Sequence, residues 1–161
     1  MIIGMRGHDF GRMEPRALAL AIREAGFEAT QLAFAKAFPA PAEQYMTPGA
    51  LSEIRSAFAG IVLPVMGCYV SASDRDPDVL AEAKARFKRS LSASVILGAG
   101  CVGTETTHFT FPESEREAAY ARLLDFTREV CAHAEQVHAL VGIEPVALHT
   151  VNTPEVTRRL S

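Results

Sequence analysis

The sequence alternates between short apolar runs rich in strand-forming residues and longer amphipathic stretches. Five runs are typical of strands, at residues 1–5, 29–35, 61–70, 101–109 and 139–146. Strands that alternate with helices in units of about 30–40 residues form right-handed βαβ units and a parallel sheet. The pattern therefore predicts an α/β protein whose strands all end at the same edge of the sheet.

Proline-containing signals mark where the helices begin. Thr47-Pro48, Asp76-Pro77 and Thr153-Pro154 each place a capping side chain before a proline at the first helical position. Glu14-Pro15 is a weaker version of the same signal. The longest helix is expected at residues 114–137, where apolar side chains recur at helical spacing.

The composition is that of one globular domain, which we expect to span residues 1–161. Hydrophobic residues make up 48% of the chain and charged residues 22%, which is enough for a sizeable core. The net charge is -3 without a long basic run, so the chain lacks the electrostatic signature of nucleic-acid binding. No apolar segment approaches the roughly 18 residues that span a membrane, and the features of a signal peptide are absent. We therefore expect a cytoplasmic protein that binds neither nucleic acid nor membrane.

The three cysteines are odd in number and widely spaced, at Cys68, Cys101 and Cys131. This spacing fits neither a disulfide framework nor a CxxC metal site. We expect reduced thiols that pack as small core residues.

One apolar run ends in a carboxylate, Glu144, with Pro145 directly after it. A charge at the end of a buried strand is costly unless it has a function. In barrel-type α/β proteins, that end of the strands is the active-site face. Polar residues at or just beyond the other strand ends are therefore candidates for substrate binding. These are His8, Gln31, Tyr69, Glu105, His108 and His149.

The last two strands are followed by two carboxylates, Glu105 and Glu144, and two histidines, His108 and His149. Carboxylate oxygens and imidazole suit Mn²⁺, Mg²⁺ or Zn²⁺, so these residues form a candidate metal or acid/base cluster. Structural alternatives remain open: an ion pair for Glu144, backbone hydrogen bonds for Glu105 and loop capping for His149.

Five parallel strands cannot close an eight-stranded barrel. The sheet is therefore either open and doubly wound, or the N-terminal part of a longer barrel. Residues 38–45, with Pro39 and Pro41, are predicted to form a loop on the active-site face and could act as a lid.

Several segments resemble the sugar phosphate isomerase/epimerase family of xylose isomerase-like TIM barrels. They are Gln31-Leu32, the run at residues 62–69, Gly103-Thr104-Glu105-Thr106, and Ile143-Glu144-Pro145-Val146 with His149-Thr150 behind it. The resemblance implies a (β/α)8 TIM barrel, of which this chain covers about the first five βα units. It also implies a divalent metal held by Glu, Asp, His and Glu, of which Glu144 corresponds to the first. The other three ligands would lie on strands that this sequence does not contain.

The resemblance further implies a sugar or sugar-phosphate isomerase or epimerase. Such an enzyme transfers a proton next to a carbonyl through an enediolate, and Glu144 would serve as both metal ligand and catalytic base. One carboxylate cannot position a divalent ion well. We therefore expect this chain alone to bind Mn²⁺, Mg²⁺ or Zn²⁺ weakly and to have little or no isomerase activity.

Two other functions remain open. The chain could be a catalytically incompetent barrel fragment that assembles as an oligomeric binding or structural protein, because unpaired sheet edges recruit partners. On either interpretation we expect a homo-oligomer. A metal-dependent endonuclease on the related barrel is disfavoured by the acidic net charge.

Overall fold

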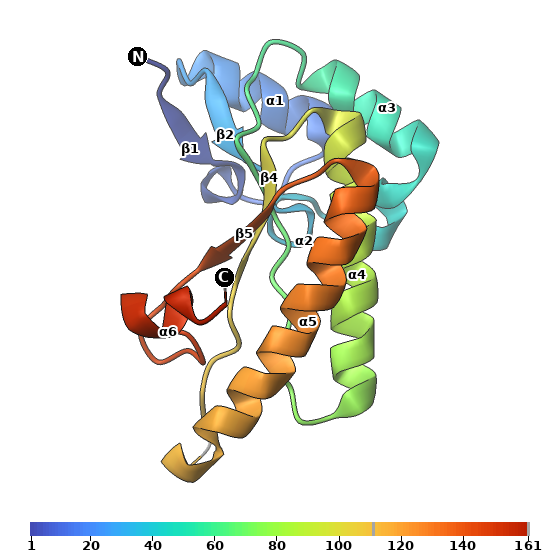
Figure 1. Ribbon diagram of the computed structural model, residues 1–161. Coiled ribbons are helices and arrows are strands. Elements are labelled where there is room, and N and C mark those ends of the chain that lie inside the picture. The colour runs from blue at the N-terminus through green and yellow to red at the C-terminus, as the bar shows by residue number, and fades with distance from the viewer. Residues whose placement is uncertain (111, 161) are drawn as a thin grey trace.

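Five parallel strands lie side by side in chain order in the computed structural model, which describes residues 1–110 and 112–160 (Figure 1). β1 pairs with β2, and β3, β4 and β5 pair in that order, always in parallel. Isolated bridges between Ala29 and Val62 and between Leu32 and Met66 join β2 to the segment that carries β3. The strands are β1 (Gly4–Arg6), β2 (Ala29–Gln31), β3 (Val65–Gly67), β4 (Cys101–Glu105) and β5 (Val141–Glu144). The chain is therefore an α/β protein with the predicted parallel strands, arranged in chain order.

Four longer helices connect the strands, and their starts agree with the sequence signals. Thr47, Asp76 and Thr153 each accept a hydrogen bond from a backbone N–H in the first turn of the helix that follows. Glu14, the weaker signal, makes no side-chain cap. The helices are α1 (Pro15–Glu24), α3 (Pro48–Ala57), α4 (Pro77–Leu97) and α5 (Arg116–Val137), with the shorter α6 (Pro154–Arg158) after β5 and 3-10 turns η1 (Gly7–Phe10) and η3 (Glu113–Glu115).

The region after β2 differs from the sequence prediction. Helix α2 (Phe34–Ala37) occupies the end of the predicted strand, and the 3-10 helix η2 (Ala42–Met46) follows it. Phe38 is completely buried, and its ring centroid lies 4.7 Å from that of the buried Tyr45. Residues 38–45, predicted to be a loop and a possible lid, are therefore anchored in the core, because burying two aromatic rings is strongly favourable.

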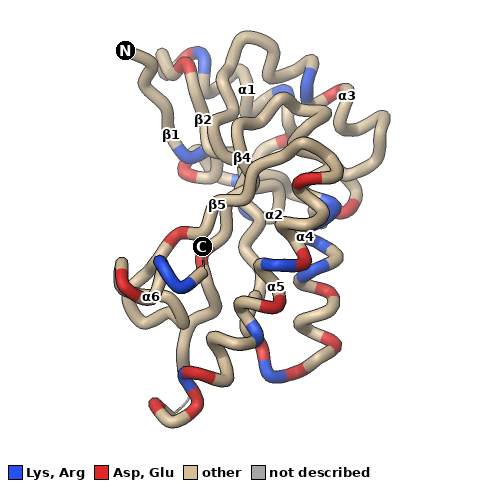
Figure 2. The backbone as a smooth tube through the Cα atoms, viewed as in Figure 1, with Lys and Arg blue, Asp and Glu red and all other residues tan. Residues whose placement is uncertain are grey.

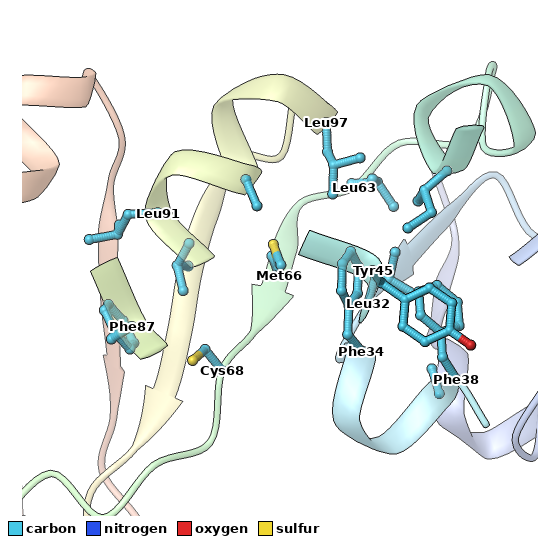
Figure 3. Packing of buried hydrophobic residues seen from close by; sticks show 14 of the residues in the cluster. Leu32, Phe34, Phe38, Tyr45, Leu63, Met66, Cys68, Phe87, Leu91 and Leu97 are labelled. Atoms are coloured by element: carbon cyan, nitrogen blue, oxygen red, sulfur yellow. The ribbon is translucent and has the colours of Figure 1, made fainter. Parts of the chain in front are cut away.

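The core lies between the sheet and the helices that cover one of its faces. Strand β4 shows the division, since Val102 and Thr104 are 0% and 2% exposed whereas the residues between them are only half-buried. Phe87 of α4 meets Phe126 of α5 edge to face, with ring centroids 5.5 Å apart. Figure 3 shows part of this core, with Leu32, Phe34, Met66 and Leu91 among the labelled side chains. Burial of this face supplies most of the apolar area removed from water.

Helices α4 and α5 run side by side and are joined by ion pairs outside the core (Figure 1). Lys84 Nζ lies 2.5 Å from Asp125 Oδ2 and 2.8 Å from Glu129 Oε2, and Lys88 Nζ lies 2.5 Å from Glu129 Oε1. These hydrogen bonds raise the pKa of Lys84 and lower the pKa of Glu129. Figure 2 shows charged segments of both signs along the two helices, which accords with their predicted solvated faces.

The three cysteines were predicted to be reduced and to pack as small core residues. Cys68 is buried, Cys101 and Cys131 are half-buried, and all three thiols are free. Burial raises the pKa of each thiol, so all three are poor nucleophiles.

Across the described part of the chain, no helix combines the length and apolar character needed to cross a membrane.

Candidate active site at the C-terminal ends of the strands

Strands β4 and β5 deliver two carboxylates to neighbouring positions. The register pairs Gly103 with Gly142 and, two residues later, Glu105 with Glu144. Because side chains alternate along a strand, the glycines and the glutamates lie on the same face, opposite the helices. The absence of side chains at the glycine positions leaves space directly before the carboxylates.

That space is an open pocket of about 470 Å³. Its walls come from four successive strands or the residues just after them. Gln31 and Tyr69 lie on one side, and Glu144 and Pro145 lie on the other, with residues of β4 between them. The remaining lining residues are Val65, Cys101, Gly103, Thr104, Gly142 and Ile143. A concave, mostly apolar surface with a few convergent polar groups is typical of a small-molecule site.

Tyr69 is the most highly connected polar residue of this pocket. Gln31 Nε2 donates a hydrogen bond to its hydroxyl oxygen at 2.9 Å, and Lys36 Nζ lies 3.5 Å from the ring centroid. Burial raises the pKa of the Tyr69 hydroxyl, and the negative charges of Glu105 and Glu144 raise it further. The hydroxyl therefore remains protonated and can donate a hydrogen bond.

His8 lies in the 3-10 turn after β1, beside the basic residues of this edge rather than in the pocket lining. Burial lowers its pKa, and the positive charges of Lys36 and Arg6 lower it further, against the opposing effect of Asp9. Its Nδ1 is buried and has no hydrogen-bond partner among the described residues. The imidazole is thus held toward its neutral form.

The two predicted histidines beyond β4 and β5 contact each other. The ring centroids of His108 and His149 lie 5.6 Å apart in an edge-to-face arrangement, and an antiparallel bridge joins the two residues. Neither residue lines the pocket that contains Glu144. The four residues predicted to form one cluster therefore separate into a carboxylate pair and a histidine pair, because His108 and His149 follow their strand ends by three and five residues.

Hydroxyl groups hold the loops around the site together. Ser73 Oγ lies 2.8 Å from Thr150 Oγ1, and the Ser73 backbone N–H donates to Thr107 Oγ1 at 2.8 Å. Thr106 Oγ1 accepts a hydrogen bond from the Val151 N–H at 3.2 Å. These contacts link the loops that follow β3, β4 and β5. The rim that carries His108 and His149 is therefore fixed by buried hydrogen bonds.

The donor set for a metal ion is only partly present. Within residues 1–110 and 112–160, no three His, Cys, Asp or Glu side chains are grouped so that they could hold a metal ion. Glu105 and Glu144 offer hard oxygen donors side by side, but a divalent ion of this kind takes about six ligands. The described residues therefore do not fit a complete metal site.

Two basic residues near the site escaped the sequence prediction. Lys36 lies in α2, directly after the run at residues 29–35 that was predicted to be a strand, and its ammonium group covers the ring of Tyr69. Arg6 ends β1, and its Nε lies 3.0 Å from Asp9 Oδ2. The strand-end rule could have identified Arg6, whereas the contact of Lys36 depends on a helix that the local pattern did not reveal.

The sequence of this chain matches the model of a known protein family. The model of the family described as xylose isomerase-like TIM barrel matches residues 19–161. The chain belongs to this family. The five parallel strands and their helices are accordingly part of a TIM barrel, as the sequence resemblance implied. Among curated proteins, none matches the sequence of this chain.

Solved structures similar to this chain share its fold at low sequence identity. The Escherichia coli 3-keto-D-glucoside 4-epimerase YcjR is 16% identical with a TM-score of 0.81, over 99% of this chain and 63% of that one. D-psicose 3-epimerase with D-fructose is 19% identical with a TM-score of 0.75, over 100% and 60%. The IOLI protein with a bound zinc atom is 18% identical with a TM-score of 0.76, over 99% and 58%. The chain thus spans about three fifths of the length of these structures.

Proposed function

We propose that this chain contributes the sugar-binding half of the active site of a sugar or sugar-phosphate isomerase or epimerase. The observation that carries the proposal is a pocket with Glu144 on one wall and Gln31 and Tyr69 on the other. Glu105, the register partner of Glu144, lies beside it but outside the pocket lining. Membership of the xylose isomerase-like family supports the same reaction class. Two similar structures are named as sugar epimerases, which supports a carbohydrate substrate.

Glu144 is proposed to act as the base. Its carboxylate takes the proton from the carbon next to the substrate carbonyl. The electron pair of that C–H bond forms a carbon–carbon double bond while the π pair of the carbonyl moves onto its oxygen, which gives an enediolate. Tyr69, with Gln31 hydrogen-bonded to its hydroxyl, binds a substrate oxygen on the other wall. A second base is needed to return a proton to the opposite face, and no described residue is assigned to that step.

A divalent cation, Mn²⁺, Mg²⁺ or Zn²⁺, is part of the proposal only as a weakly held group. The zinc atom in the IOLI protein supports a metal in relatives of this chain. Glu144 would be one of its ligands, but the donor set of the described residues is incomplete. We therefore assign no reaction step of this chain to a metal.

Solvent exchange tests the proposed base without requiring the second one. The chain is incubated with a ketohexose in D₂O, and loss of the proton next to the carbonyl is followed by NMR. We expect slow exchange without accumulation of the epimer, and loss of exchange in Glu144→Gln. Glu135→Gln, on the exposed side of α5, is the matched control and should exchange normally. Exchange that survives in Glu144→Gln would overturn the assignment.

A second candidate function is that of an oligomeric binding or structural protein. Strand β1 has no partner on its outer edge among the described strands, and Ile2 and Ile3 beside it are 61% and 53% exposed. Exposed apolar strand edges favour association. A protein that forms stable homo-oligomers and binds sugar, but never exchanges the substrate proton, would favour this second function.

A further inference from the structure

Tyr69 has one hydrogen-bonding capacity that the protein itself leaves unused. A phenol offers one O–H donor and can accept through its oxygen lone pairs. The bond from Gln31 Nε2 occupies an acceptor position, because the amide N–H is the donor. Among the described residues, no acceptor for the Tyr69 O–H is found. The proton therefore remains available to a ligand in the pocket.

The orientation of the phenol is fixed from two directions. Gln31, at the end of β2, hydrogen-bonds the hydroxyl oxygen, and Lys36 of α2 lies over the face of the ring. A cation over an aromatic face is attracted by the ring quadrupole. A hydrogen bond at the hydroxyl and a contact on the ring face together restrict movement of the ring.

The surroundings of the hydroxyl select the kind of oxygen that it can bind. Glu105 and Glu144 both act on Tyr69 electrostatically and disfavour a further negative charge beside it, against the opposing effects of Arg6 and of Lys36 over the ring. A neutral carbonyl or hydroxyl oxygen accepts a hydrogen bond without that repulsion. A phosphate group at this position would lie near two carboxylates, which is unfavourable.

We propose that Gln31 and Lys36 are positioning residues that hold the Tyr69 hydroxyl as a donor to a neutral sugar oxygen across the pocket from Glu144. This inference rests on the proposed function. It assigns a hydrogen-bond donor to one wall of the pocket and a proton acceptor to the other. The Tyr69 hydroxyl, on the β2 and β3 side, binds an uncharged oxygen, and Glu144, on the β5 side, accepts the proton. An anionic substituent of the substrate would then have to lie outside this pocket.

Ultraviolet titration of the tyrosines tests the positioning without any substrate. Tyr69→Phe identifies the contribution of Tyr69 to the absorbance change at alkaline pH. We expect the Tyr69 midpoint to rise in Gln31→Met and in Lys36→Met, because each change removes a group that stabilises the phenolate. Gln44→Met, on η2 and outside this pocket, is the control and should leave the midpoint unchanged. An unchanged midpoint in Gln31→Met would overturn the positioning role.

Binding of D-fructose, measured by NMR titration, tests the donor role. Loss of one hydrogen bond in Tyr69→Phe should weaken binding by roughly fivefold to tenfold, with circular dichroism confirming that the variant is folded. Gln31→Met should weaken binding less, since the hydroxyl remains but is no longer held. Equal affinity of wild type and Tyr69→Phe, or no binding by wild type, would refute the donor role. The proposed base is judged separately, by the exchange reaction that depends on Glu144.

Discussion

The two faces of strand β4 have different roles: one packs in the core, and the other faces the pocket. On the helix side, Val102 and Thr104 are closed off from solvent and belong to the interior between the sheet and α4 and α5. On the other face, Gly103 lines the pocket, and Glu105 lies beside Glu144 of β5, whose carboxylate lines the pocket. Stability and proposed function thus alternate residue by residue along one strand. Substitutions on the two faces should therefore have separable effects.

The largest expected effect is on the helix side. Phe87→Ala removes a ring that is 0% exposed and packed against Phe126, so the free energy of unfolding should fall by about 3–5 kcal/mol. Val79→Ala, at an exposed site of the same helix, should change stability by less than about 0.5 kcal/mol. Urea denaturation measures both. Equal, small effects of the two substitutions would contradict a closed core on this face.

A smaller effect is expected on the pocket side, where two glycines can be compared directly. A Cβ atom at Gly103 would lie 2.9 Å from Val65 Cγ1, whereas one at Gly142 would meet its nearest atom, Cys101 Sγ, at 3.6 Å. Gly103→Ala should therefore lower the free energy of unfolding by about 1–3 kcal/mol, as for other overpacked sites. Gly142→Ala should be nearly neutral. If the two variants have the same melting temperature, Gly103 does not lie as close to Val65 as the structure places it.

The outer ion pairs should contribute less again and depend on pH. The folded-state pKa of Glu129 is lowered by Lys84 and Lys88, so its contribution is present above its unfolded pKa and is lost as pH falls through the folded pKa. Its side chain is 43% exposed, so Glu129→Gln should cost only about 0.5 kcal/mol at pH 7. The deficit should disappear in acid. Glu135→Gln, at an exposed position on the same helix, should show no such pH-dependent deficit.

The smallest effect on stability is expected at the proposed base. Glu144 is exposed at the end of β5, so Glu144→Gln should change the free energy of unfolding by no more than about 0.5 kcal/mol. Calorimetric titration with Mn²⁺ should show binding weaker than micromolar in wild type and none in the variant. Micromolar or tighter binding that depends on Glu144 would mean that the chain completes a metal site by itself.

The fold was predictable where the signal is local. Helix starts could be predicted because the side-chain oxygen of a capping residue accepts a hydrogen bond from an N–H only a few residues away, as at Thr47, Asp76 and Thr153. The parallel direction of the strands followed from the βαβ alternation, whereas their order did not, because doubly wound sheets and barrels share that alternation. Strand length was not predictable either, because an apolar run continues past the last hydrogen bond between the strands. Helix α2 was missed since its burial depends on contacts with residues distant in the sequence.

The candidate site was predictable only in part. Strand-end polarity predicted Gln31, Tyr69 and Glu144 as site residues, and the structure places these three in the lining of one pocket. The same rule placed His108 and His149 with the carboxylates, although loop geometry pairs them with each other instead. Lys36 could not be found, because a cation above an aromatic face exists only after α2 and the residue following β3 have packed together.

The hydroxyl contacts at the rim also constrain the order in which the molecule assembles. Ser73 and Thr150 lie 77 positions apart in the chain, and Thr106 and Val151 lie 45 apart. Closing loops of this length costs entropy that is repaid only after the intervening strands have paired. The rim should therefore be among the last regions to become ordered during folding, and among the first to open when the native state fluctuates.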